Sequence, residues 1–251
     1  MIHFVGAGCG APDLITLRGK KHIENADVII YAGSLVNKEL LEYAKKGCAI
    51  YDSAKMTLEE IMDVISQAEQ KGLVTVRLHT GDPSLYGAIG EQMRELDRLG
   101  IEYDITPGVS AFSGAAAALK TEYTLPDVSQ TVIITRAAGR TGVPGSEDLR
   151  SLASHGATMV LYLSAGLLDK VSHDLMAGGY DADTPAAIVY KATWADEKVF
   201  RCTVGTLNQT AAANGITKTA LVAVGKFLGS SFTRSCLYNP GFSTEFREAS
   251  K

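Results

Sequence analysis

Three short glycine-containing turns in the first half of the chain are the segments best suited to chemistry on a small molecule. They read Gly6-Ala-Gly-Cys-Gly-Ala-Pro12, Thr80-Gly-Asp-Pro83 and Pro107-Gly-Val-Ser-Ala111. Each follows a short apolar run typical of a buried strand, and each leads toward a helix-like segment. Because glycine carries no side chain, such turns allow the backbone to approach a ligand closely.

The order of these turns predicts that they share one pocket. Open α/β sheets bind ligands at the edge where the carboxyl ends of their strands meet. Any one turn, taken alone, is more simply explained as an ordinary strand-to-helix connection. The three together favour a common binding site for a small molecule.

The first turn also fits a relaxed dinucleotide-binding fingerprint, Gly6-x-Gly8-x-x-Ala11. That fingerprint requires an acidic residue at the end of the second strand to hold a ribose. The second apolar run here ends Ile29-Ile30-Tyr31-Ala32-Gly33, and Asp27 stands at its beginning instead. A nicotinamide-dependent dehydrogenase is therefore the disfavoured alternative, and a non-catalytic binding module is a third.

The elements that must position the turns alternate between strands and helices. The clearest helix is Thr57–Gln70, which opens with the capping box Thr57-x-x-Glu60 and stops at Gly72. Alternation of this kind predicts a parallel sheet covered on both faces. The expected strands of this first domain are Ile2–Val5, Val28–Tyr31, Ala49–Tyr51, Val74–Leu78 and Tyr103–Ile105.

A second set of strands follows a small-residue helix at Ala111–Leu119. Two of them, Ala186–Tyr190 and Val199–Thr203, are separated by a short loop, which predicts an antiparallel hairpin and hence a mixed sheet. We therefore expect an N-terminal α/β domain over 1–118, a C-terminal α/β domain over 128–229 and a polar tail over 230–251. The other expected strands are Thr131–Thr135, Thr158–Leu161 and Ala220–Val224, with helices at Ile89–Leu99, Glu147–Ser154, Leu167–Ala177 and Val204–Ala213.

The composition argues against nucleic acids and membranes as partners. The 251 residues carry a net charge of −4, which argues against a nucleic-acid surface because such surfaces are normally basic. No apolar stretch is long enough for a membrane span, and no signal peptide is visible at the start. The four cysteines form no C-x-x-C pair, so we expect reduced thiols, a cytoplasmic protein and no metal site.

The three turns, in this order, resemble those of the tetrapyrrole methyltransferases. That family shows G-x-G-x-G-x-P-x-L-[LI]-T near its start, then G-D-P, then P-G-[VI]-[ST]-A, which stand here at Gly6–Thr16, Gly81–Pro83 and Pro107–Ala111. The segments YAGSLV (31–36) and TRAAGRTGVPGSEDL (135–149) resemble the branch that methylates C-11 of precorrin-4 or cobalt-precorrin-4. The resemblance covers residues 1 to about 229.

The resemblance implies S-adenosylmethionine as methyl donor and S-adenosylhomocysteine as product, in the biosynthesis of the corrin ring. It also implies two α/β domains with the active-site cleft between them, and a homodimer. No catalytic side chain is expected, because the methyl group is already activated and the nucleophile is a ring carbon; the task is to position two reactants. The donor-binding residues that the resemblance implies are Pro12, Thr80, Gly81, Asp82, Leu85, Ser110, Ala111, Leu163, Ala192 and Ala220.

The implied acceptor is a macrocycle with many carboxylates, so its site needs cationic side chains. Guanidinium groups pair with carboxylates through two parallel hydrogen bonds, which makes Arg136 and Arg140 the best candidates. His79 is a further candidate as a substrate contact or base, although a histidine near a strand end is more often structural. Asp82 has two interpretations, as a cap of its own turn or as a contact for the donor. The sequence leaves open whether the ring already carries cobalt.

Overall fold

The computed structural model describes residues 1–229 and 232–250, which fold as two compact units. The first comprises Met1–Gly114 together with Lys191–Glu197, and the second comprises Ala115–Tyr190 together with Lys198–Lys251. Both differ from the expected ranges 1–118 and 128–229. The chain passes into the second unit earlier than expected, and a loop from its later half belongs to the first.

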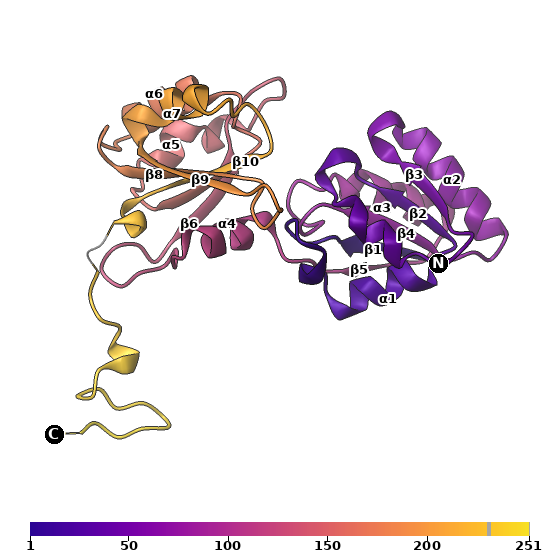
Figure 1. The fold of residues 1–251 in the computed structure, drawn as a ribbon, viewed down its shortest axis with the longest axis horizontal. Coiled ribbons are helices and arrows are strands. Elements are labelled where there is room, and N and C mark those ends of the chain that lie inside the picture. The colour runs from indigo at the N-terminus through magenta and orange to yellow at the C-terminus, as the bar shows by residue number, and fades with distance from the viewer. Residues whose placement is uncertain (230–231, 251) are drawn as a thin grey trace. The chain divides into compact units, whose positions relative to one another are not determined.

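The first unit is built on a five-stranded parallel sheet in the order β3-β2-β4-β1-β5, as the alternation of strands and helices predicts (Figure 1). Because every strand runs the same way, the connections that follow β1, β4 and β5 all leave from one edge. These connections are the three glycine turns. The strands are β1 (Ile2–Gly6), β2 (Val28–Tyr31), β3 (Ala49–Asp52), β4 (Thr75–His79) and β5 (Tyr103–Thr106).

Helices cover both faces of this sheet (Figure 1). Helices α2 (Leu58–Gln70) and α3 (Ile89–Leu99) bury one face, where Phe4 is fully enclosed. Helix α1 (Leu17–Asn25) and the 3-10 turns η3 (Lys38–Tyr43) bury the other, where Val5 lies. The predicted capping box of α2 is present, with both of its hydrogen bonds formed.

Strand β4 places three polar side chains inside the layer under α2 and α3. Thr75, Arg77 and His79 are each at most 5% exposed. The Arg77 guanidinium donates to Gln92 Oε1 and to the Ile30 carbonyl oxygen, both at 3.0 Å. Burial lowers the pKa of Arg77 to about 10, so the group remains charged at neutral pH while its acceptors are uncharged.

The second unit holds a mixed five-stranded sheet in the order β6-β7-β10-β8-β9. Strands β6 and β7 are parallel, and the other three pairs are antiparallel. The predicted hairpin is confirmed, since β8 pairs with β9 through the expected short connection. The strands are β6 (Val132–Arg136), β7 (Thr158–Tyr162), β8 (Pro185–Tyr190), β9 (Lys198–Thr203) and β10 (Ala220–Val224).

Helices α5 (Leu149–Ala153), α6 (Leu168–Ala177) and α7 (Leu207–Ala213) cover one face of this second sheet, and α4 (Ala111–Leu119) lies on the opposite side (Figure 1). Leu119, in the last turn of α4, is buried, and its carbonyl oxygen accepts a hydrogen bond from Arg201 at 2.8 Å. Tyr123 then packs edge-on against Phe227. The segment expected to link two domains is thus part of the second unit, which explains the early boundary.

The C-terminal tail, expected as a polar segment over 230–251, is described for residues 232–250; residues 230, 231 and 251 lie outside the described residues. It contains one short 3-10 turn, η8 (Cys236–Tyr238). Phe232 and Phe246 are 60% and 93% exposed, so the tail carries apolar surface as well as polar groups. Among the described helices, none has the length and apolar character required to cross a bilayer.

Candidate active site

The three glycine turns meet at the carboxyl edge of the parallel sheet. Gly8 and Gly81 form a two-way bridge, in which the Gly8 N–H donates to the Gly81 carbonyl oxygen (3.2 Å) and the Gly81 N–H donates back (2.8 Å). The Gly108 N–H donates to Asp82 Oδ2 at 2.9 Å. Backbone hydrogen bonds therefore join the first turn to the second, and a carboxylate joins the second to the third.

The glycines allow the turns to pack on one another. A Cβ atom on Gly6 would lie 2.5 Å from the Gly108 nitrogen and 2.7 Å from the Gly81 carbonyl oxygen, too close for any side chain. A Cβ on Gly108 would overlap that same oxygen. The sequence predicts that these glycines allow close approach of a ligand; in the structure they allow close approach of one backbone segment to another.

The Asp82 carboxylate joins the second turn to the third. Of the two roles that the sequence leaves open, a structural cap or a contact for the donor, the hydrogen bonds of Asp82 favour the structural one. Its Oδ1 accepts from the Ser84 N–H (2.9 Å) and from the Ser84 hydroxyl, and its Oδ2 accepts from Gly108. Partial burial would raise the pKa of Asp82, but the hydrogen bonds from Ser84 and Gly108 outweigh it and hold the pKa below its ordinary value. The carboxylate is therefore charged at neutral pH.

Two side chains at the end of β4 have buried polar atoms without a hydrogen-bond partner among the described residues. These atoms are Thr80 Oγ1 and His79 Nε2. Burial, with a smaller contribution from Arg77, lowers the pKa of His79 to about 3, so its ring is neutral. His79 points into the layer under α2 and α3 beside Phe4, whereas Thr80 already belongs to the turn. Thr80 is thus the better placed of the two to receive a ligand.

The segment after the second turn is strained. Tyr86 and Ala88 adopt left-handed backbone angles (φ +56° and +50°), a region that costs non-glycine residues energy. Leu85, a predicted contact residue, is half-buried at the start of this segment. Strained backbone persists only where the surrounding structure holds it in place, and it clusters at ligand sites.

The remaining predicted residues of the first unit lie around the same turns. Pro12 begins the 3-10 turn η1 (Pro12–Leu14) that closes the first glycine turn. Ser110 is buried beside Gly81 at the start of α4, and the Ala111 nitrogen would lie 3.4 Å from a Cβ on Gly81. The backbone at Gly81 thus packs closely against the start of α4, where the side chains are small.

Loop Lys191–Glu197 joins this group, although it lies between two strands of the second sheet in the chain. Thr193 Oγ1 accepts from the Ala11 N–H at 3.0 Å, and the Trp194 ring packs over Gly10. Ala192 is 7% exposed, and its Cβ would lie 3.4 Å from a Cβ on Gly114. The sequence predicts a role for Ala192 but not for Thr193 or Trp194, although the chain's single tryptophan, placed in a loop, is a signal for this site.

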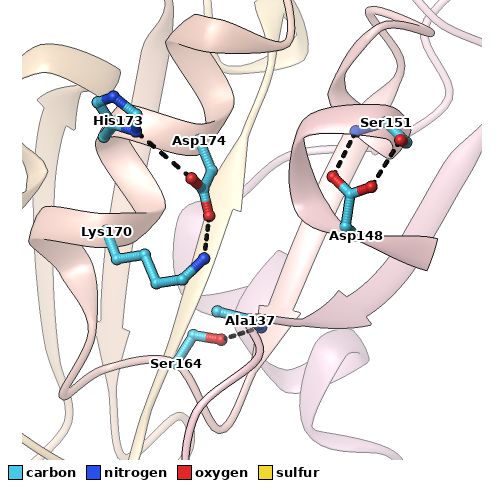
Figure 2. Close-up of polar contacts among 7 residues, drawn as sticks. All are labelled: Ala137, Asp148, Ser151, Ser164, Lys170, His173 and Asp174. Atoms are coloured by element: carbon cyan, nitrogen blue, oxygen red, sulfur yellow. Dashed lines mark hydrogen bonds and ion pairs between the residues drawn. The ribbon is translucent and has the colours of Figure 1, made fainter. Parts of the chain in front are cut away.

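In the second unit, the predicted residues Arg136, Leu163 and Ala220 gather at one edge of the mixed sheet. Arg136 ends β6, Leu163 follows the parallel strand β7, and Ala220 begins β10, which runs antiparallel to β7. Leu163 has a left-handed backbone (φ +52°) and is 65% exposed, an uncommon combination for leucine. Figure 2 shows the Ala137 N–H donating to Ser164 Oγ (2.8 Å), which fixes the ends of β6 and β7 together.

The two candidate carboxylate ligands differ in their surroundings. The Arg136 guanidinium donates to the carbonyl oxygens of Thr141 (3.2 Å) and Gly142, so it braces the loop after β6. Arg140 lies on that loop and is exposed. The structure thus gives Arg136 a structural task and leaves Arg140 at the surface.

The charged groups on α5 and α6 in Figure 2 serve the helices themselves. Asp148 caps α5 by accepting from the Ser151 N–H (2.9 Å) and hydroxyl (2.7 Å), and these bonds lower the pKa of Asp148. On α6, Asp174 pairs with Lys170 and His173.

The chain has two α/β units, and in the first of them hydrogen bonds join three glycine turns. This arrangement is typical of enzymes that bind small molecules at the carboxyl ends of strands. The sequence model of the Tetrapyrrole (Corrin/Porphyrin) Methylases matches residues 1–208. The chain belongs to this family.

Named relatives within the family agree closely along the whole chain. A cobalt-precorrin-4 C(11)-methyltransferase of Methanocaldococcus jannaschii is 54% identical over 98% of this chain and 96% of its own. One of Priestia megaterium is 45% identical over 100% and 98%. The solved structure of a cobalt precorrin-4 methyltransferase, CbiF, has a TM-score of 0.89 at 46% identity, covering 91% and 96%. A uroporphyrin-III C-methyl transferase from Thermus thermophilus, solved with S-adenosyl homocysteine, scores 0.76 at 25% identity, covering 90% and 98%.

Proposed function

We propose that this chain transfers a methyl group to C-11 of precorrin-4 or cobalt-precorrin-4 during assembly of the corrin ring. The observation that carries the proposal is the fastened set of three glycine turns, in a chain about half identical over its full length to enzymes named for this reaction. The resemblance of residues 31–36 and 135–149 to that branch of the family points the same way.

We propose S-adenosylmethionine as the donor, with the turns as its site. The fit rests on Thr80 Oγ1, a buried hydroxyl with no partner among the described residues, and on the small side chains around it. A relative whose structure contains S-adenosyl homocysteine supports this choice. When bound, the donor would supply a methyl group already activated on a sulfonium. The residues of the first unit that would contact it are Pro12, Thr80, Gly81, Leu85, Ser110, Ala111 and Ala192.

The chain's own contribution to the reaction is position. Backbone groups held by the Gly8–Gly81 bridge and by Asp82 keep the turns in place before any ligand arrives. Positioning two reactants for direct displacement can contribute roughly 7–11 kcal/mol to lowering the barrier. The neutral ring of His79 is buried away from the turns, so we assign it no role as a base.

We propose that cationic side chains on the loop after β6 hold the carboxylates of the ring. Arg140 is the better candidate, because it is exposed while Arg136 is engaged by carbonyl oxygens of its own loop. We further infer a homodimer in the cytoplasm, as the resemblance implies; the four cysteines, all free thiols, are consistent with a reducing compartment.

The experiment that tests the function is isotope transfer. The protein is incubated with S-adenosylmethionine labelled with ¹³C on the methyl group, separately with precorrin-4 and with cobalt-precorrin-4. We expect label at C-11, located by NMR of the product, and the faster of the two reactions identifies the natural form of the ring. Label at another ring carbon, or transfer to neither ring, would overturn the proposal.

A further inference from the structure

A cluster of two histidines and one aspartate lies in the first unit, apart from the glycine turns. His3 is in β1, Asp104 is its direct neighbour in the parallel pairing of β1 with β5, and His22 is near the end of α1. One nitrogen from each ring and one carboxylate oxygen all lie within 4.8 Å of one another. His3 and Asp104 are the second residues of their strands, so the cluster is at the amino edge of the sheet, while the turns follow the carboxyl ends.

We propose that His3, His22 and Asp104 bind a divalent transition-metal ion of the zinc type. Two imidazole nitrogens with one carboxylate oxygen form a donor set that suits zinc and also cobalt, nickel and copper. Three protein ligands leave a fourth position for water in a tetrahedral site.

The spacing is close to what such an ion requires. With metal–ligand bonds of about 2.0–2.2 Å, ligand atoms in a tetrahedral site stand about 3.4 Å apart. His3 Nδ1 and Asp104 Oδ1 are already 2.9 Å apart. All three ligand atoms lie within 4.8 Å of one another, so a shift of about an ångström in His22 would complete the tetrahedral spacing.

His22 is the ligand that must turn. Its ring is stacked on that of His3, with centroids 3.9 Å apart and planes 29° apart, whereas a metal lies in the plane of each ring that binds it. The His22 side chain is half-buried at the surface of α1, and the site requires it to rotate out of the stack. The stack shows that the two rings already share one small space from two different elements.

The surroundings of His22 favour the neutral form of its ring. Burial is the main cause that lowers the pKa of His22, followed by the nearby His3, while Asp104 acts in the opposite sense. A neutral imidazole is the form that binds metal. Arg18, one turn earlier on α1, is the opposing cation, and it is exposed and solvated.

Such an ion would join the first strand, the edge strand and the helix that covers them. Binding only to the folded state would stabilise that state by mass action. The turns lie at the other end of the strands, so methyl transfer should not depend on the ion. The proposal is therefore independent of the function proposed above.

The test uses the full chain without any histidine tag, freed of metal by a chelator. Co²⁺ serves as a spectroscopic probe, because tetrahedral cobalt absorbs strongly in the visible, and Zn²⁺ affinity is measured by competition with a chelating dye. We expect one equivalent of either ion to bind with micromolar affinity or better. A Zn²⁺ excess of a hundredfold over Kd should raise Tm by about 5 °C or more.

Three variants with one matched control decide between outcomes. His22→Gln, His3→Gln and Asp104→Asn should each weaken Zn²⁺ binding at least about tenfold, since even loss of groups behind a ligand costs that much. His173→Gln, which removes a histidine 80% exposed beside Asp174, should bind like wild type. Circular dichroism confirms that each variant is folded, and His22→Gln, at the helix surface, decides the matter if a strand variant does not fold.

Several results would overturn the proposal. Absence of a visible cobalt spectrum, Zn²⁺ affinity weaker than millimolar, or wild-type binding by His22→Gln would each do so. A near-ultraviolet sulfur-to-cobalt band would also overturn it, because it would assign the ion to one of the four thiols instead.

Discussion

At the scale of single residues, Thr80 offers the sharpest test of the donor site. We predict that Thr80→Val weakens binding of S-adenosylhomocysteine by about two- to twelvefold, the usual contribution of one hydrogen bond. The free energy of unfolding without ligand should stay equal or rise slightly, because the hydroxyl has no partner among the described residues. Calorimetric titration and urea unfolding measure the two effects.

Thr75 is the natural control for Thr80. It carries a second buried hydroxyl with no partner among the described residues, at the opposite end of β4. Thr75→Val should leave the affinity unchanged while acting similarly on stability. Equal affinity losses in the two variants would point to a general effect on the strand and not to a contact with the donor.

Asp82 links stability to pH. Its pKa is lower in the folded protein than the ordinary value of 3.8, so its hydrogen bonds stabilise the fold fully above that value. The stabilisation is lost as the pH falls through the lower, folded pKa. We predict that Asp82→Asn costs about 1–3 kcal/mol at pH 7, because it weakens hydrogen bonds to a charged acceptor.

The pH dependence of this difference is the check on Asp82. Unfolding by urea is followed for wild type and Asp82→Asn from pH 7 downward. The two curves of free energy should converge below pH 3.8, where the wild-type carboxylate takes up its proton. A constant gap across the whole range would mean that the charge of Asp82 contributes nothing.

At the scale of elements, the packing of the turns predicts an asymmetry among glycines. Gly108→Ala should prevent folding or cost several kcal/mol, since its Cβ would overlap the Gly81 carbonyl oxygen. Gly90→Ala, in α3 with open space around it, should stabilise the protein by about 0.4–1 kcal/mol. Thermal melts of both variants test this, and a benign Gly108→Ala would contradict the packing described here.

The two arginines at the end of β6 and on the loop after it, Arg136 and Arg140, are expected to have different roles. Arg140→Ala should weaken binding of the tetrapyrrole about tenfold, with Tm and donor affinity unchanged. Arg136→Ala should lower Tm as well, because it releases the carbonyl oxygens of Thr141 and Gly142. If neither variant changes tetrapyrrole binding, other residues hold the carboxylates.

The sequence predicts helices and strands well where the spacing of apolar residues follows one regular pattern. Strand β2 and helix α3 begin and end at the predicted residues, since apolar runs and helical spacing mark them. The segment 204–213 departs from its prediction, because its first three residues form a 3-10 turn, η6 (Val204–Thr206), before α7. The bounds of α1 were not predicted, and only Gly19 and Ile23 of its nine residues are buried, so it has no broad apolar stripe.

The candidate site was predictable only in part. That the turns lie at one edge follows from the parallel sheet. The two-way bridge of Gly8 with Gly81 and the choice between two roles for Asp82 depend on distances that no spacing reveals. The attachment of loop Lys191–Glu197 to the first unit is tertiary, since its sequence neighbours are strands of the second sheet.

At the scale of the whole molecule, ligand selectivity separates the methylase from the dehydrogenase that the first turn alone would suggest. We predict measurable binding of S-adenosylhomocysteine and none of NAD, because no acid follows Tyr31 to hold a ribose. Calorimetry with both ligands on one preparation is the measurement. Micromolar NAD binding without S-adenosylhomocysteine binding would reverse the assignment.

The proposed homodimer is tested by mass. One chain weighs 26.6 kDa, so light scattering during gel filtration should give about twice that value across a range of concentrations. A mass of one chain at working concentration would rule the dimer out.

The fastening of the turns through backbone atoms has a consequence for how this protein can change over generations. A binding site assembled mainly from N–H and carbonyl groups keeps its shape when the side chains around it are exchanged, provided that Gly6, Gly108 and the Asp82 carboxylate remain. Substitutions at the rim can then alter which acceptor is bound without rebuilding the place where the methyl group is delivered. Because main-chain groups shape the donor site, substitutions of the surrounding side chains can change substrate specificity while methyl transfer is retained.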